Sequence, residues 1–78
     1  MISRRIHIGS IIKNELEKQG RKHSWLAKQL CFERTNVYNI FRRSTIDTEL
    51  LMRISELLQV DFFALYSDML KNVQQSVE

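Results

Sequence analysis

The chain has 78 residues, 44% of them hydrophobic and 27% charged, which indicates one globular domain that buries roughly 60% of its unfolded surface. No apolar run approaches the ~20 residues needed to span a bilayer, and the first residues lack the apolar segment of a signal peptide, so we expect a cytoplasmic protein with no membrane partner. One cysteine and two distant histidines leave no internal disulfide and no zinc site, and we expect no metal and no cofactor.

Charge is divided unevenly along the chain, although the formal net charge is only +3. Residues 1–43 hold ten Lys and Arg against three acids, a balance of +7. Residues 44–78 hold two against six, a balance of −4. Positive charge concentrated in one part of a small domain is typical of nucleic-acid-binding proteins.

The first predicted elements are a basic arm and a helix. Residues 1–7 are expected to form the arm, and the alternative is a frayed terminus. Gly20 provides the left-handed residue that commonly ends a helix. A helix is predicted before it, over residues 9–19, because apolar side chains recur at helical spacing, at Ile8, Ile12 and Leu16.

Two short helices joined by a tight turn are predicted between residues 22 and 43. The earlier one begins near residues 22–24, where Ser24 is the better chemical N-cap, although the spacing also allows an earlier start. The later one covers residues 34–42 and has one buried face. Only three residues separate the two helices, so they must cross at a steep angle, with Phe32 pointing inward. The apolar residues of the buried face are Val37, Ile40 and Phe41.

The outward side of helix 34–42 carries a single polar stripe in which every charge is positive. A solvated helix usually mixes charges of both signs. Arg can read guanine, Asn can read adenine and Thr can contact the thymine methyl group, so the stripe indicates the reading of base edges. The alternative is the polar outer face of a small bundle. The stripe consists of Arg34, Thr35, Tyr38, Asn39 and Arg42.

Two further helices are predicted by their N-caps, Asp47 and Asp61. Each cap follows an apolar residue able to form a hydrophobic staple with a residue inside the helix. Five helices and no strand result, so we expect an all-α, compact five-helix domain over residues 8–70. Residues 71–78 are expected to form a C-terminal tail.

That tail indicates how two copies could assemble. If the last helix continues past Asp68, an apolar line extends from Tyr66 along it. The core is complete near residue 70, so the line is expected to face a second copy in a homodimer; the alternative is that the tail frays. The line continues through Met69, Val73 and Val77.

The segment WLAKQLCFERTNVYNIFRR, with the helix before it and LLMRISELLQVDFFALYS after it, resembles the helix-turn-helix domains of phage lambda repressor and Cro type, the XRE family of transcriptional regulators. The resemblance covers residues 8–67. It implies a lambda repressor-like fold that binds double-stranded DNA with its third helix in the major groove, and a transcriptional regulator that we expect to be a repressor. The resemblance implies base reading by Arg34, Thr35, Tyr38 and Asn39, and phosphate binding by His23, Asn36, Arg42 and Arg43.

Three residues depart from the family pattern. Cys31 stands where the turn usually has Gly, and a non-glycine residue at positive φ costs about 1 kcal/mol. Glu33 stands where Ser or Thr usually caps the third helix, and its carboxylate would repel phosphates unless it accepts a hydrogen bond from cytosine or pairs with Arg34. His23 stands where Gln commonly opens the second helix.

No nucleophile–base pair, carboxylate pair or glycine-rich phosphate loop can be assembled from the sequence, so an enzyme is not expected. The alternative to DNA binding is a small helical protein-interaction module, either an adaptor or an antitoxin-like subunit, without specific DNA readout. Salt dependence separates the two functions, because only a DNA binder loses affinity steeply as salt rises.

Overall fold

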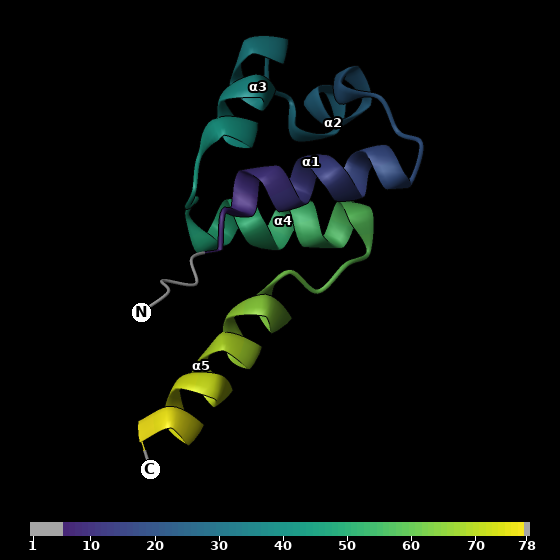
Figure 1. Ribbon diagram of the computed structural model, residues 1–78. Helices are drawn as coiled ribbons and strands as arrows, with labels where there is room; N and C mark the ends of the chain where they lie inside the picture. The colour runs from purple at the N-terminus through teal and green to yellow at the C-terminus, as the bar shows by residue number, and fades with distance from the viewer. Residues whose placement is uncertain (1–5, 78) are drawn as a thin grey trace.

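The computed structural model describes residues 6–77, and the side chains of residues 6–72. Within that range no strand occurs, so the predicted all-α, five-helix class is confirmed. Of the basic arm predicted for residues 1–7, only Ile6 and His7 lie inside the described residues. The helices are α1 (Ile8–Lys18), α2 (His23–Leu30), α3 (Arg34–Arg42), α4 (Thr48–Leu58) and α5 (Phe63–Val77) (Figure 1).

The starts of the helices follow from local hydrogen bonds. The Asp47 carboxylate accepts a hydrogen bond from the Leu50 amide at 2.7 Å, and Asp61 accepts one from the Ala64 amide at 3.2 Å. Both predicted caps are therefore confirmed. Ser24 is not a cap, because α2 begins one residue before it and no side chain caps that end.

Three helices end in the same way, with one residue in the left-handed conformation. These residues are Gly20 at φ 73°, Cys31 at φ 59° and Gln59 at φ 57°. In each case the amide of the next residue donates to a carbonyl five residues earlier, which satisfies an end of the helix that would otherwise lack partners. The turn geometry usually supplied by glycine is thus made here by a cysteine and a glutamine.

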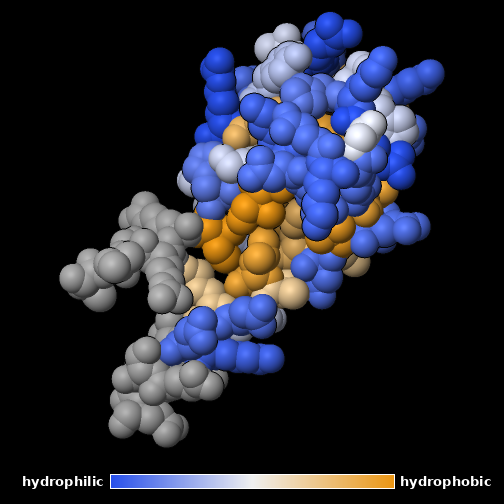
Figure 2. Space-filling model, turned by 45° about the vertical axis from the view of Figure 1, so that its right-hand side comes forward, coloured by the Kyte–Doolittle hydropathy of each residue, from blue (hydrophilic) through white to orange (hydrophobic). Residues whose placement is uncertain are grey.

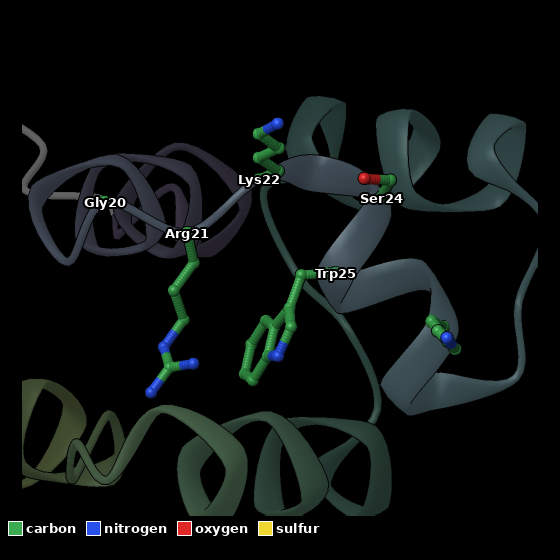
Figure 3. Close-up of a pocket in the computed structure, with 6 residues that line it drawn as sticks. Gly20, Arg21, Lys22, Ser24 and Trp25 are labelled. Carbon is green, nitrogen blue, oxygen red and sulfur yellow. The ribbon is translucent and has the colours of Figure 1, made fainter.

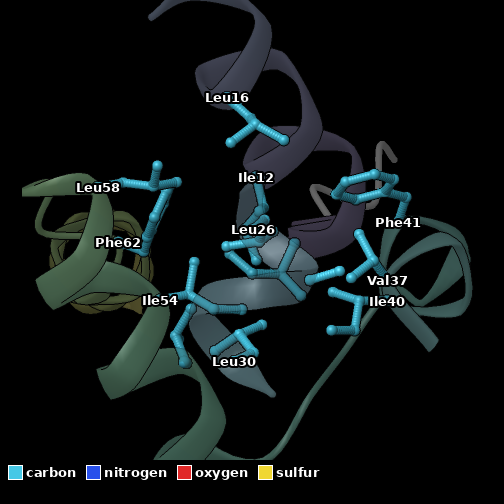
Figure 4. Packing of buried hydrophobic residues seen from close by; sticks show 13 residues of the cluster. Ile12, Leu16, Leu26, Leu30, Val37, Ile40, Phe41, Ile54, Leu58 and Phe62 are labelled. Atoms are coloured by element: carbon cyan, nitrogen blue, oxygen red, sulfur yellow. The ribbon is translucent and has the colours of Figure 1, made fainter. Parts of the chain in front are cut away.

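The core is formed by side chains of α1, α2, α3 and α4 and by Phe62, which precedes α5 (Figure 4). None of the buried residues in the described part of the chain is polar or charged. Trp25 and Phe32 are partly buried and pack against the core, so Phe32, which was expected to point inward, is not fully enclosed. The thirteen buried residues are Ile8, Ile12, Leu16, Leu26, Ala27, Leu30, Val37, Ile40, Phe41, Leu51, Ile54, Leu58 and Phe62.

A backbone junction joins the start of α1 to the end of α3. The Ile8 amide donates to the Ser44 carbonyl at 3.1 Å, and the Gly9 amide donates to the Arg43 carbonyl at 2.9 Å. Gly9 is buried there, and a Cβ at this position would lie 2.2 Å from the carbonyl oxygen of Ile40. The absence of a side chain at Gly9 therefore allows α3 to approach α1 this closely.

The last helix, α5, leaves the body of the molecule (Figure 1). The radius of gyration is 13.9 Å, against about 11.5 Å for a compact domain of this length. Side chains at the start of α5 pack against the core, but Leu70 is 63% exposed. The helix continues without a break past residue 70 into residues 71–77, which were predicted to belong to a C-terminal tail.

Candidate nucleic-acid interface

The candidate interface is built on α3, which packs against both α1 and α2. Its buried side is formed by the three apolar residues predicted from the sequence, Val37, Ile40 and Phe41. Hydrophilic side chains gather over the part of the molecule where α2 and α3 lie, while hydrophobic atoms are exposed at the level of α1 and α4 (Figure 2). The outward side of α3 is therefore a polar surface at one end of the domain.

The four residues predicted to read bases share this outward side. Arg34, Thr35, Tyr38 and Asn39 are all exposed. Tyr38 alone among them is also held by neighbours, since its ring contacts His23 and Phe41 edge-on and remains 44% exposed. No acidic side chain among the described residues pairs with Arg34, so within this part of the chain its guanidinium is free to meet a ligand.

Three of the four residues predicted to bind phosphate lie beside the reading residues. Asn36, Arg42 and Arg43 are exposed, and neither arginine forms an ion pair with another described residue. Arg43 follows α3 in an extended conformation, and its carbonyl is the acceptor of the Gly9 amide. Its backbone is thus fixed by the junction with α1, while its side chain stays in solvent.

The fourth predicted phosphate-binding residue, His23, occupies a different environment. Its ring packs edge-on against Phe41 at 4.9 Å and Tyr38 at 5.5 Å between centroids, so it joins the start of α2 to α3. Its Nε2 lies 3.7 Å from a carboxylate oxygen of Glu17. His23 is half-buried. The structure therefore gives His23 a packing role in addition to its place beside the interface.

The turn before α3 brings an acid to the same end of the helix. Glu33 is in the N-cap position in an extended conformation, but its side chain makes no capping hydrogen bond. It forms no ion pair with Arg34, which was one of the two roles expected for it. No described side chain therefore caps the amides at the start of α3, and this end of the helix dipole favours a nearby anion.

Acids also mark one edge of the interface. A hollow of about 290 Å³ lies between the turn and the start of α4, lined by Phe32, Asp47, Glu49, Leu50 and Arg53. The two carboxylates are exposed there, and Arg53 reaches back to the Leu30 carbonyl at 3.5 Å. This acidic edge was not predicted as part of the site, because it arises only when the start of α4 folds beside the turn.

Neither a metal centre nor a membrane span is found among the described residues. No group of three or more His, Cys, Asp or Glu side chains could hold an ion there. None of the described helices is long and apolar enough to cross a bilayer. No family model, curated protein or solved structure matches the chain.

Proposed function

We propose that this protein is a sequence-specific transcriptional regulator that binds double-stranded DNA with α3 in the major groove, and that it acts as a repressor. The observation that carries the proposal is the outward side of α3. It presents hydrogen-bonding side chains, and cations that have no acidic partner within residues 6–72, on a helix whose other side is buried in the core. A helix of this kind fits the major groove and can read base edges there.

Each polar residue of α3 has a role in this proposal. Arg34, Thr35, Tyr38 and Asn39 read bases, because they share the outward side. Asn36, Arg42 and Arg43 bind phosphates and set the position of the helix on the duplex. His23 reaches the same backbone from the start of α2, where it also holds Tyr38 in place.

The resemblance to the lambda repressor and Cro type supports this docking, as does the basic character of residues 1–43. Repression requires only that the bound protein cover a site needed for transcription. The exposed acids Asp47 and Glu49 repel phosphates, so we expect the DNA backbone to pass on the opposite side of α3 from the start of α4.

The proposed regulator acts as a homodimer formed through α5. The helix projects from the body, it continues to Val77, and Leu70 on it is 63% exposed. Met69 of the predicted apolar line is half-buried, whereas the side chains of Val73 and Val77 lie outside the described residues. A two-fold axis along this surface would place the two α3 helices on half-sites about 34 Å apart, which requires a palindromic site.

The test is selection of bound duplexes from a random pool, followed by a salt titration with the selected site. Roughly four to six phosphate contacts per copy predict that log K for one copy on a half-site falls with log salt at a slope of about −4 to −5, and that the slope for a homodimer on the full site is about twice as steep. A protein-interaction module would select no common sequence and would show little binding at any salt concentration. Either of those results would refute the proposal.

A further inference from the structure

A second surface lies at the turn between α1 and α2. An open pocket of about 430 Å³ is lined there by Gly20, Arg21, Lys22, Ser24, Trp25 and Lys28 (Figure 3). Three of these six residues are cations and none is an acid. The proposed DNA contacts do not include any of them.

Arg21 is fixed in this pocket by contacts on two sides. Its guanidinium carbon lies 4.1 Å from the centroid of the Trp25 ring, and its Nε–H donates to Gln19 Oε1 at 3.1 Å. The amide group of Gln19 in turn donates to the Leu58 carbonyl and to the Glu15 carboxylate, each at 2.9 Å. A chain of contacts thus connects the guanidinium to the end of α4.

The remaining edge of the guanidinium is free. Its two terminal amino groups have no partner among the described residues. A planar guanidinium held in one orientation presents a fork that matches a carboxylate with two parallel hydrogen bonds. Because the contacts with Trp25 and Gln19 already restrict the Arg21 side chain, less side-chain entropy is lost when such a partner binds.

The fork points away from the proposed DNA interface. In Figure 3 the side chain of Arg21, from the turn before α2, and that of Trp25, from α2, extend toward α4, on the opposite side from α3. Trp25 is only partly buried, so part of its ring borders the pocket and is available to an apolar side chain. Trp and Arg are the residues that most often dominate binding energy at protein interfaces.

We propose that this pocket binds an acidic segment of a partner protein. One carboxylate of the segment lies on the Arg21 fork, and a neighbouring apolar side chain packs against Trp25. The positive charges of Lys22 and Lys28 complement further acids of the same segment. The proposal goes beyond DNA binding, because a protein docked through α3 could hold this partner at the same time.

Trp25 allows the proposal to be tested directly, since it is the single tryptophan of the chain. The probe is a short synthetic peptide of Asp and Glu residues around a central Leu-Phe pair, and the matched peptide has Asn and Gln in place of the acids. We expect the acidic peptide to shift Trp25 emission and the amide peptide to leave it unchanged. Arg21→Gln should weaken binding of the acidic peptide at least tenfold, in a variant whose thermal unfolding by circular dichroism confirms that it is folded.

Arg42→Gln is the matched control, because it removes the same charge at the proposed DNA interface. It should weaken duplex DNA binding and leave peptide binding unchanged, whereas Arg21→Gln should do the reverse. The proposal is wrong if the peptide does not bind, or if it binds Arg21→Gln as tightly as the unaltered protein. It is also wrong if Arg21→Gln weakens DNA binding as much as Arg42→Gln does, or if inorganic phosphate shifts Trp25 emission as strongly as the peptide.

Discussion

Gly9 is the residue that allows the end of α3 to lie against α1. In Gly9→Ala the new Cβ would meet the carbonyl oxygens of Ile40, Phe41 and Arg43, all of them backbone atoms that cannot move aside alone. We expect this variant to lose about 1–3 kcal/mol of unfolding free energy, the usual cost of overpacking a close contact. Urea denaturation followed by circular dichroism measures the loss.

Gly20→Ala provides the comparison, since nothing lies within 4 Å of a Cβ at Gly20. Only the positive φ of 73° opposes the substitution, at a cost of about 1 kcal/mol. If the two alanine variants proved equally stable, the close approach at Gly9 would not limit stability.

At Cys31 we expect substitution to raise stability. The residue has a left-handed backbone conformation, which glycine adopts more easily than a residue with a side chain. Cys31→Gly should raise the unfolding free energy by about 1 kcal/mol, since it removes the penalty of φ 59°. Gln29→Gly, two residues earlier and inside α2, should instead lower it by up to about 1 kcal/mol. Thermal unfolding of the two variants side by side gives both signs, and destabilisation in both would contradict the prediction.

At the scale of the element, we expect different residues of α3 to read the DNA bases and to position the helix on the DNA backbone. Arg34→Ala or Asn39→Ala should relax base preference at one position of the selected site, at a cost of about 1–3 kcal/mol. Arg42→Ala or Arg43→Ala should weaken all duplexes almost equally and make the salt slope less steep by about one unit. Competition binding against a panel of single-base variants distinguishes the two effects. Unchanged sequence preference in Arg34→Ala would mean that α3 does not read the site.

The elements were predictable from the sequence because their signals are local. Val37, Ile40 and Phe41 lie within one helix, and Asp47 and Asp61 cap amides three residues away, so spacing and chemistry alone identified them. The start of α2 was left open between two positions, since no side chain caps it. The exposure of the polar residues of α3 was predictable because the apolar residues on the other side of the helix had to be buried.

Other features depend on residues far apart in the chain and could not be predicted in this way. His23 was assigned to a phosphate through family resemblance, but its contacts with Tyr38, Phe41 and Glu17 exist only once α2 meets α1 and α3. The order imposed on Arg21 likewise needs the carbonyl of Leu58, which α4 supplies. Neither set of contacts can be recognised from the spacing of residues along one helix.

At the scale of the whole molecule, α5 decides the expected assembly. We predict that the full chain sediments as a dimer at tens of micromolar and that a chain lacking residues 70–78 sediments as a monomer, because the deletion removes the exposed Leu70 together with Val73 and Val77 of the predicted apolar line. Leu70→Glu should have the same effect without shortening the chain. Met52→Glu, at an exposed apolar position on α4, is the matched control and should remain a dimer.

Equal sedimentation of the full and shortened chains would exclude a dimer built on α5. DNA binding by a monomer would still follow from the α3 surface, but with a single half-site. The unequal distribution of charge affects either form, because ten of the twelve basic residues belong to the part of the chain that contains α1 to α3, while six of the nine acids belong to the part that contains α4 and α5. The field of the molecule therefore favours its approach to DNA with the α3 end first.

The junction between α1 and the residues after α3 has a consequence for the protein during its synthesis. It closes residues 8–44 into a loop whose ends meet, and the entropy lost in closing such a loop rises only slowly with its length. Every residue proposed to touch DNA lies inside that loop, but Leu51, Ile54 and Leu58, which complete the core, emerge from the ribosome later. A nascent chain that has reached residue 47 thus carries the whole set of proposed contacts without the packing that holds them in place.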